Sequence, residues 1–387
     1  MIREDLGFVF YMPTRVIFGA SSLQEVPLEA SRLGVDKVVL VSDRVLAEKT
    51  DIVQRAERLL GQKLVAEFLD VPSDSSVETV EKGYELAKAK GAEGVVSIGG
   101  GSVIDTAKGI AILLSEGGHL RDYEGFQNLS KKVAPHIAVP TTAGTGSEVT
   151  YVAVIKDEQA KRKILFGDYN ILPDSAILDP ELTVSLPPHL TAATGMDALS
   201  HAIEALTSLQ SEPISDALAL HSIRLLREAM PRCIEALDDL RARGAQLIAS
   251  CIAGAAFSNA QVGLCHAIAH TVGAQFGIHH GLANSIALPF VIMFNYETAV
   301  EKYKMIANAF GISGEVTGKT LAVAIQAFAK SLGLPYAFKD LGVPEDALSF
   351  LAEQTLADGA IVYNARTVTD PGEILPVWEA CFTGEIV

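Results

Sequence analysis

The sequence has few cysteines and no long apolar run, and both shortages narrow the classes of protein it can belong to. Its four cysteines in 387 residues form no C-x-x-C pair, so the pattern matches neither a disulfide framework nor a zinc ribbon. The longest uncharged apolar stretches, Leu247–Phe257 and Ser285–Phe294, are shorter than the ~18–20 residues that span a bilayer. The first residues include acidic side chains and no apolar signal-peptide core. We therefore expect a cytoplasmic protein with no membrane partner.

Positive charge is also scarce. Lysine and arginine number 31 against 47 aspartates and glutamates, which gives a net charge of −16 at pH 7. Phosphate backbones repel a chain of this charge, so we expect no nucleic-acid partner. Apolar residues make up 49% and charged residues 20% of the chain, which permits a large buried core, and a chain of this length is expected to form two domains.

The pattern of apolar residues changes once along the chain. In the first part, short apolar runs such as Val38–Val41, Gly94–Ile98 and Ile137–Val139 alternate with helical patterns, which is typical of a parallel sheet covered on both faces. After Pro187 the pattern is long, rich in alanine and leucine, and helical. The sequence therefore predicts an α/β, Rossmann-like domain over residues 1–185 and an all-helical domain over residues 186–387. Parallel sheets bind ligands at the carboxyl ends of their strands, so we expect the active site in the cleft between the domains.

Two polar loops follow predicted strands of the first domain. Gly99-Gly100-Gly101-Ser102 precedes a predicted helix, where glycines allow a ligand to approach the backbone and the helix N-terminus suits a pyrophosphate. This loop has neither the G-x-G-x-x-G spacing nor the Gly-Lys-Ser/Thr of a P-loop, so a plain strand-to-helix turn is the alternative. The second loop, Thr141–Glu148, carries hydroxyls that could bind phosphate or ribose, and an ordinary Ser/Thr turn is its alternative.

Asp43 comes just after the predicted strand Val38–Val41. A carboxylate in this position of a Rossmann-like sheet can accept hydrogen bonds from the adenosine ribose and repel a 2′-phosphate, which favours NAD over NADP. The alternative is that Asp43 caps the helix predicted over residues 44–47.

Acidic and histidine side chains with helical spacing predict a metal centre in the second domain. Asp197 and His201 are four residues apart, as are His266 and His270, and this spacing places each pair on one helix face. Three imidazoles and a carboxylate suit Fe²⁺ or Zn²⁺. The alternative is a set of hydrogen-bonded core histidines and a surface Asp–His pair.

One distance limits how such a centre can form. A continuous helix from His266 to His280 would separate the two residues by about 21 Å, which is too far for one ion to contact both. Gly273 and Gly277 offer the break that would return the chain. The spacing leaves open which of the later histidines are ligands: His270, His279 and His280.

Four motifs together resemble the iron-containing, group III alcohol dehydrogenases. They are GGGSVIDTAK (Gly99–Lys108), PTTAGTGSEVT (Pro140–Thr150), GMDALSHAIEA (Gly195–Ala205) and HAIAHTVGAQFGIHHGLANSIALP (His266–Pro289). The resemblance covers nearly the whole chain. It implies a Rossmann-like N-terminal domain followed by an all-α C-terminal domain, the fold shared by dehydroquinate synthase and the iron alcohol dehydrogenases.

The resemblance assigns roles to residues by their motif positions. His270 matches the family's non-ligand histidine near the substrate, and we expect it to be catalytic, passing the released proton to solvent, because an imidazole pKa near ~6.5 suits that transfer. His279 matches no family role. The implied metal ligands are Asp197, His201, His266 and His280. The implied cofactor contacts, added to Asp43, are Gly99, Gly100, Gly101, Ser102, Asp105, Thr141, Thr142, Thr145, Ser147 and Lys163.

The activity that the resemblance implies is reversible hydride transfer between a short primary alcohol or diol and NAD, at a centre holding Fe²⁺, with Zn²⁺ as the other candidate. The partner is then a small alcohol or aldehyde, and the family implies a homodimer or larger homo-oligomer. Two alternatives come from the same fold: a zinc-dependent glycerol dehydrogenase-like enzyme and a dehydroquinate synthase-like enzyme. A third alternative is a nucleotide- or metal-sensing protein without catalytic activity.

Overall fold

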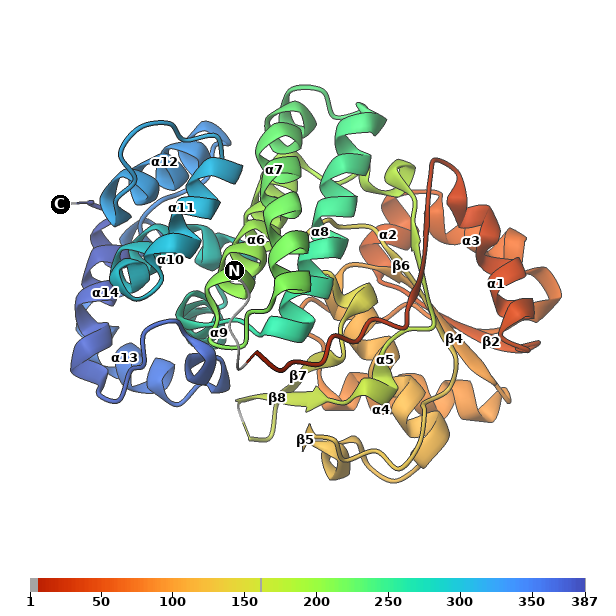
Figure 1. Ribbon diagram of the computed structural model, residues 1–387. Coiled ribbons are helices and arrows are strands. Elements are labelled where there is room, and N and C mark those ends of the chain that lie inside the picture. Colours follow the sequence, from red (N-terminus) through yellow and green to blue (C-terminus); the bar gives the residue numbers. More distant parts are fainter. Residues whose placement is uncertain (1–5, 161, 387) are drawn as a thin grey trace. The chain divides into compact units, whose positions relative to one another are not determined.

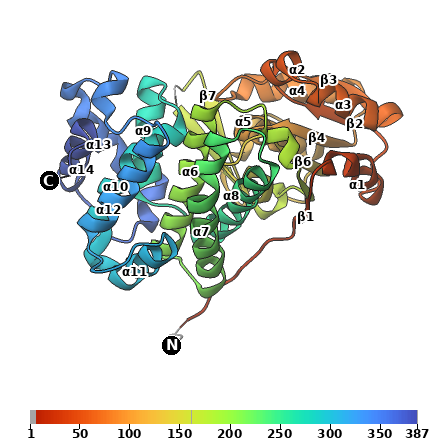
Figure 2. The same cartoon turned by 90° about the horizontal axis from the view of Figure 1, so that it is seen from above.

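The computed structural model describes residues 6–160 and 162–386 (Figures 1 and 2), and the chain forms two compact units. The α/β unit consists of Pro13–Leu186 and Leu237–Cys251. The helical unit consists of the segment that ends at Met12, Pro187–Ala236 and residues from Ile252 onward. The division therefore differs in two segments from a single boundary near residue 185: the segment that ends at Met12 groups with the helical unit, and Leu237–Cys251 groups with the α/β unit.

A six-stranded parallel sheet forms the centre of the α/β unit. The connections between parallel neighbours cross the faces of the sheet and bury both of them, which explains why the predicted strands are apolar throughout. The parallel sheet that the sequence predicts is confirmed. Its strands lie in the order β1 (Arg15–Phe18), β9 (Ser175–Leu178), β6 (His136–Pro140), β4 (Gly94–Gly99), β2 (Val38–Val41) and β3 (Leu64–Phe68).

Helices cover both faces of this sheet, and strand β2 shows how the sequence directs them. Successive side chains of a strand point to opposite faces. Val39 and Val41 pack in one core cluster with α4 (Val77–Ala89) and α5 (Gly101–Glu116). Val38 and Leu40 pack in another cluster with α1 (Val26–Arg32) and α3 (Ile52–Leu60). The short helix α2 (Arg44–Lys49) follows β2 directly.

Two further strand-like segments form a small second sheet together with a strand of two residues. β7 (Val152–Asp157) pairs antiparallel with β8 (Arg162–Gly167), and β8 pairs in parallel with the two-residue β5 (Gly125–Phe126). β7 and β8 are separated by only four residues, and strands joined so closely pair as a hairpin because a parallel crossover needs a longer connection.

The helical unit is built around α6 (Pro188–Thr207), in which every residue from Thr191 to Thr207 is buried. α10 (His280–Asn295) packs against α6 and against three other helices of the unit: α9 (Leu264–Phe276), α12 (Gly318–Ser331) and α14 (Pro371–Thr383). The helical unit also contains α7 (Pro213–Glu235), α11 (Val300–Ala309), α13 (Leu348–Leu356) and the part of α8 (Leu240–Ala260) that follows Cys251, whereas the part of α8 up to Cys251 groups with the α/β unit. No single helix in the described part of the chain is long and apolar enough to cross a membrane. α8 and α9 have the necessary length and apolar composition only when taken together, and the pair is bent by 104°.

The close packing of α10 on α6 generates a stability prediction. A Cβ at Gly281 would lie 2.2 Å from the carbonyl oxygen of Ala193 and 2.7 Å from its carbonyl carbon, and these backbone atoms cannot rotate away. We predict that G281A lowers the free energy of unfolding of the helical unit by about 1–3 kcal/mol or more, the usual cost of overpacking. Urea unfolding followed by circular dichroism measures it.

The matched control is G359A, because a Cβ at Gly359 would meet nothing within 4 Å. Equal urea midpoints for the two variants would show that α6 and α10 do not approach as closely as described.

Candidate functional site

The middle of α6 carries three buried polar side chains on one face. Asp197, His201 and Glu204 are 2%, 5% and 4% exposed. Their spacing of four and three residues brings them onto adjacent turns of the same face. A buried helix has no water to solvate a carboxylate or an imidazole, so each of these groups needs a partner from a neighbouring helix.

Helices α9 and α10 supply those partners because the chain turns sharply between them. α9 ends at Phe276, followed by Gly277 in the left-handed conformation (φ 67°), and α10 begins at His280. The rings of His266 and His280 are thereby brought to a centroid distance of 5.4 Å. The break predicted between them is present, but Gly277 alone makes it, since Gly273 lies inside α9.

The side chains of Asp197, His201, His266 and His280 come together in one group. One ligand atom from each lies within 4.8 Å of all the others. Asp197 Oδ1 is 3.4 Å from His280 Nε2 and 3.9 Å from His266 Nε2, and Asp197 Oδ2 is 4.0 Å from His201 Nδ1. His279 is exposed and precedes the first residue of α10, so of the two adjacent histidines it is His280 that joins the group.

The chemistry of this group suits a divalent cation. His266 Nε2 is buried and has no hydrogen-bond partner among the described residues. Burial raises the pKa of Asp197 to about 7 and lowers the pKa of His266 well below its usual value. When deprotonated, the carboxyl of Asp197 and the three imidazoles can offer electron pairs to the space they share, which is the ligand set of borderline ions such as Zn²⁺ and Fe²⁺.

Two further side chains hold the members of this group in place. Glu204 Oε2 lies 2.6 Å from His266 Nδ1, and Asn284 donates from Nδ2 to Asp197 Oδ1 over 2.8 Å. Burial raises the pKa of Glu204 to about 7. Sequence reasoning missed both residues, although Glu204 lies three residues after His201 and Asn284 four after His280, which is the spacing that could have identified them.

His270 lies beside the group without being a member of it. Its ring stacks on that of His280 at a centroid distance of 5.4 Å, and its Nδ1 is 3.0 Å from Asp358 Oδ2. Burial would raise the pKa of Asp358, but the interaction with His270 lowers it below its usual value. Asp358 is a third residue that sequence reasoning missed, because it is 88 positions away from its partner and no local spacing connects them.

In the α/β unit, the two polar loops pack against each other at the ends of the adjacent strands β4 and β6. A Cβ at Gly101 would come within 2.8 Å of Thr145 Cγ2, and one at Gly100 within 3.3 Å of Thr142 Cγ2. Thr141 donates its backbone N–H to the carbonyl oxygen of Gly99 over 3.0 Å. The glycines are therefore needed for this contact, and α5, which begins at Gly101, directs its N-terminal N–H groups into this region.

Asp105 of α5 is partly buried, with a side chain 13% exposed, and contacts the second sheet. Its Oδ2 accepts a hydrogen bond from the N–H of Val154 over 3.0 Å, and its Oδ1 lies 3.8 Å from Lys108 Nζ. Lys108 is fully buried, donates to Thr150 Oγ1 and to the carbonyl oxygen of Val152, and has its pKa lowered by burial to about 8. Lys108 was missed from the sequence, although it lies three residues after Asp105 in the glycine motif.

The remaining candidate cofactor residues lie apart from these loop contacts or bind other groups. Lys163 Nζ is 2.9 Å from Asp74 Oδ1, and the N–H of Asp74 donates to Ser102 Oγ over 3.3 Å, so Asp74 connects Lys163 to the glycine loop. Ser147 begins a 3₁₀ helix of three residues. Asp43 Oδ1 accepts from the N–H of Leu46 over 2.8 Å, so Asp43 caps α2, as the alternative reading expected.

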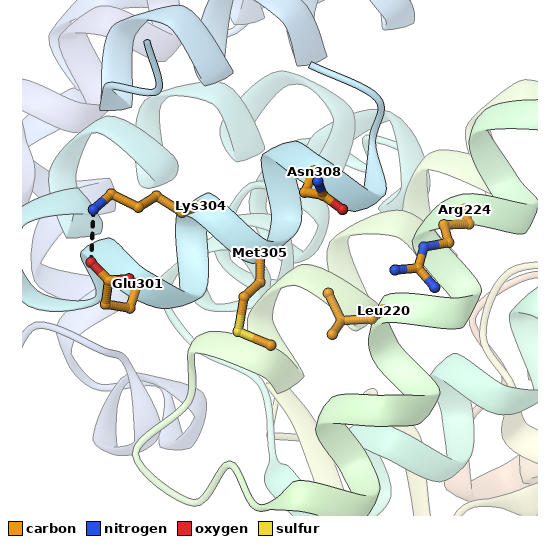
Figure 3. A pocket seen from close by; sticks show the side chains of 6 residues that line it. All are labelled: Leu220, Arg224, Glu301, Lys304, Met305 and Asn308. Atoms are coloured by element: carbon orange, nitrogen blue, oxygen red, sulfur yellow. Dashed lines mark hydrogen bonds and ion pairs between the residues drawn. The ribbon is translucent and has the colours of Figure 1, made fainter. Parts of the chain in front are cut away.

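A surface pocket of about 370 Å³ lies between α7 and α11 of the helical unit (Figure 3). Glu301 and Lys304 form an ion pair of 2.7 Å at its edge. None of its lining residues is a candidate site residue, so it plays no part in the site described above. They are Leu220, Arg224, Glu301, Lys304, Met305 and Asn308.

Comparisons with known proteins extend over almost the whole chain. The model of the iron-containing alcohol dehydrogenases matches residues 13–180, and that of the C-terminal part of the Fe-containing alcohol dehydrogenase family matches residues 191–380. The chain is 36% identical to the NAD-dependent methanol dehydrogenase of Bacillus methanolicus over 374 residues, which cover 95% of this chain and 98% of that one. It is 34% identical to the 1,3-propanediol dehydrogenase of Klebsiella pneumoniae, with 97% and 99% covered.

Solved structures also match the fold over almost the whole chain. A 1,3-propanediol oxidoreductase has a TM-score of 0.93 and 33% identity, with 97% of this chain and 100% of that chain covered. The sulfoacetaldehyde reductase of Bifidobacterium kashiwanohense, in complex with NAD⁺, has a TM-score of 0.89 and 28% identity, with 97% and 99% covered. These matches confirm the predicted pairing of a Rossmann-like domain with a helical domain.

The raised pKa of Asp197 generates a prediction for cation binding. With a pKa of about 7, the carboxyl is protonated in the cation-free protein below that pH, and a cation must displace the proton. We therefore expect affinity for Co²⁺ or Zn²⁺ to fall by about tenfold for each pH unit below 7 from this group alone. Equilibrium dialysis between about pH 8 and about pH 5.5 measures it, with circular dichroism as the control for folding. An affinity that does not change over this range contradicts the prediction.

Proposed function

Because this chain belongs to the iron-containing alcohol dehydrogenase family, we propose that it catalyses reversible hydride transfer between a short primary alcohol or diol and NAD, at a centre that holds Fe²⁺. Asp197, His201, His266 and His280 are the proposed ligands. Both matched family models describe iron-containing alcohol dehydrogenases, which supports this class over the zinc-dependent glycerol dehydrogenase-like and dehydroquinate synthase-like alternatives.

A single observation carries the metal part of the proposal. His266 Nε2 is buried, has no hydrogen-bond partner in the described part of the chain and lies 3.9 Å from Asp197 Oδ1. Both atoms present electron pairs, and at this distance neither can donate to the other. A buried polar atom without a partner is costly, and a cation shared by these two atoms and the other two ligands would remove that cost.

When bound, the cation would supply a Lewis acid that lowers the pKa of an alcohol hydroxyl, and the dinucleotide would supply the hydride acceptor. The chain's own residues bind and orient the cofactor. The N–H groups at the start of α5 and the glycine loop would hold the pyrophosphate. Asp105 and Lys163 would hold the nicotinamide end, and the hydroxyls of Thr141, Thr142, Thr145 and Ser147 would complete the cofactor contacts.

His270 is the proposed route for the proton released when the alcohol hydroxyl ionises. Asp358 binds Nδ1 of the ring at 3.0 Å, which leaves Nε2 as the nitrogen that can receive a proton. Its side chain is 26% exposed, so the proton can pass on to water. The overall reaction then yields aldehyde, NADH and one proton from alcohol and NAD⁺.

The choice of substrate follows the relatives' names. Relatives of this chain are described as methanol and 1,3-propanediol dehydrogenases, so short alcohols and diols are the first to test. We propose a homodimer or larger homo-oligomer, which light scattering would measure.

The direct test of function is an anaerobic screen of the protein reconstituted with Fe²⁺ or Zn²⁺, with short alcohols, diols and aldehydes, and with NAD and NADP. NAD binding without turnover of any of these would favour the sensing alternative.

Loss of a proposed ligand separates metal binding from cofactor binding. We predict that H266A loses its cation and lowers kcat by more than about 100-fold, since even changes outside the ligand shell cost 10–100-fold. NADH binding, measured by fluorescence, should change little, because the proposed cofactor residues are in other segments. Metal analysis measures the loss of the cation, and steady-state kinetics measure the fall in kcat. H221A is the matched control, since His221 is an exposed histidine of α7. Full activity of H266A would overturn the ligand assignment.

Asp43 allows its capping role and its proposed cofactor role to be tested apart. D43N keeps an oxygen that can accept the hydrogen bond from Leu46 N–H but removes the negative charge. We predict that D43N unfolds at the wild-type temperature and uses NADP relative to NAD about tenfold or more better, because repulsion of the 2′-phosphate is lost. D43A should show the same change in cofactor use together with the loss of about 1 kcal/mol of stability. An unchanged NADP/NAD ratio in both variants would leave Asp43 with the capping role alone.

A further inference from the structure

Glu204 of α6 occupies a position that the proposed function does not explain. It lies one helical turn after His201, is 4% exposed, and points its carboxylate at the start of a different helix, α9. We propose that Glu204 is the positioning residue of the metal centre, which fixes the His266 ring so that Nε2 faces the other three ligands. This inference rests on the proposed function, in that His266 must be a ligand.

The carboxylate of Glu204 accepts hydrogen bonds from three backbone N–H groups and also lies within hydrogen-bond distance of a ring nitrogen of His266. The backbone N–H of Cys265 donates to Oε1 over 2.6 Å. The backbone N–H groups of Gly263 and His266 donate to Oε2 over 3.0 and 3.3 Å, and His266 Nδ1 lies 2.6 Å from the same oxygen. When Glu204 is ionised, neither of its oxygens carries a hydrogen to donate, so the ring nitrogen that faces Oε2 at 2.6 Å carries the hydrogen.

That assignment determines what the other ring nitrogen can do. A neutral imidazole with hydrogen on Nδ1 has only a lone pair on Nε2. Nε2 of His266 is the buried atom without a hydrogen bond, and it faces Asp197 Oδ1. Glu204 thus selects the tautomer in which His266 can bind a cation and also fixes the rotation of the ring, the arrangement in which a carboxylate orients a metal-ligating histidine.

Glu204 also takes the place of a cap for α9. The residue before this helix is Gly263, which has no side chain to accept from the first N–H groups. A Cβ there would lie 3.2 Å from Glu204 Oε1 and 2.9 Å from Asn364 Oδ1, so glycine is needed for the two helices to approach this closely. One face of α6 therefore supplies two ligands, Asp197 and His201, and also fixes the start of the helix that supplies the third.

The arrangement makes glutamine a poor substitute for Glu204. An amide has one accepting oxygen, while both carboxylate oxygens here face N–H donors, so the NH₂ group of glutamine would face a donor in either orientation. Aspartate keeps two accepting oxygens but is one methylene shorter, so it should restore part of the function. Glu212 is a matched control, because it is 3% exposed and accepts from the N–H groups of Ile214 and Ser215, both at 2.7 Å, at the start of α7, without contacting a histidine.

The experiment compares full-length wild-type protein, E204Q, E204D and E212Q after removal of metal. Each is titrated with Co²⁺, and both the dissociation constant and the visible absorption spectrum are recorded. We expect E204Q to bind Co²⁺ about 10–100-fold more weakly with an altered spectrum, E204D to lie between E204Q and wild type, and E212Q to match wild type in both measurements. Weakening by the same factor in E204Q and E212Q would mean a general loss of helix capping and would overturn the proposal.

Two outcomes separate this inference from the proposed function. Wild-type protein that takes up no cation would overturn both. Wild-type protein that binds Co²⁺, together with an E204Q that binds it equally well, would overturn the inference alone. If E204Q does not fold, ¹⁵N NMR of histidine-labelled, metal-free wild type decides: hydrogen on Nδ1 of His266 supports the proposal, and hydrogen on Nε2 overturns it.

Discussion

The burial of acidic and imidazole groups in the middle of α6 is the constraint on which the helical unit depends. α6 is buried at every residue from Thr191 to Thr207, and a helix buried in this way would ordinarily be apolar on every face, yet this one carries Asp197, His201 and Glu204. Burying such groups is tolerated only where hydrogen bonds or opposite charge compensate for lost water. The neighbouring helices supply that compensation, and their arrangement follows from it.

Each neighbour meets α6 through a contact that a larger or differently shaped residue would prevent. Gly263 directly precedes α9, and a Cβ there would meet Asn364 and Glu204. α10 begins with His280-Gly281, and a Cβ at Gly281 would meet the backbone of Ala193. The two contacts fix the starts of α9 and α10 beside the polar face of α6. His266 and His280 lie at or near those starts, so the backbone packing and the side-chain cluster depend on each other.

In the α/β unit, too, glycines allow two segments to pack closely, but here the segments are loops. Its parallel sheet ends in the glycine turn after β4 and the threonine-rich loop after β6, and these loops pack so closely that side chains at Gly100 or Gly101 would meet Thr142 or Thr145. No side chain caps the start of α5, and in the proposed function its first backbone N–H groups would hold the pyrophosphate. The buried Lys108 and the partly buried Asp105 hold α5 against the strand that begins at Val152.

Local patterns in the sequence were enough to predict the parallel sheet, the helical second half, the residues of the four motifs and a chain break between His266 and His280. These features depend on side-chain periodicity and on glycine's backbone freedom, which act over a few residues. Packing between segments decided the rest. It selected His280 over His279 for the cluster, placed Gly273 inside a helix, gave Asp43 a capping role, and paired His266 with Glu204 and His270 with Asp358. Helical spacing specifies which side chains share a face, but the distance between two faces depends on the whole core, so no pattern along the chain contains it.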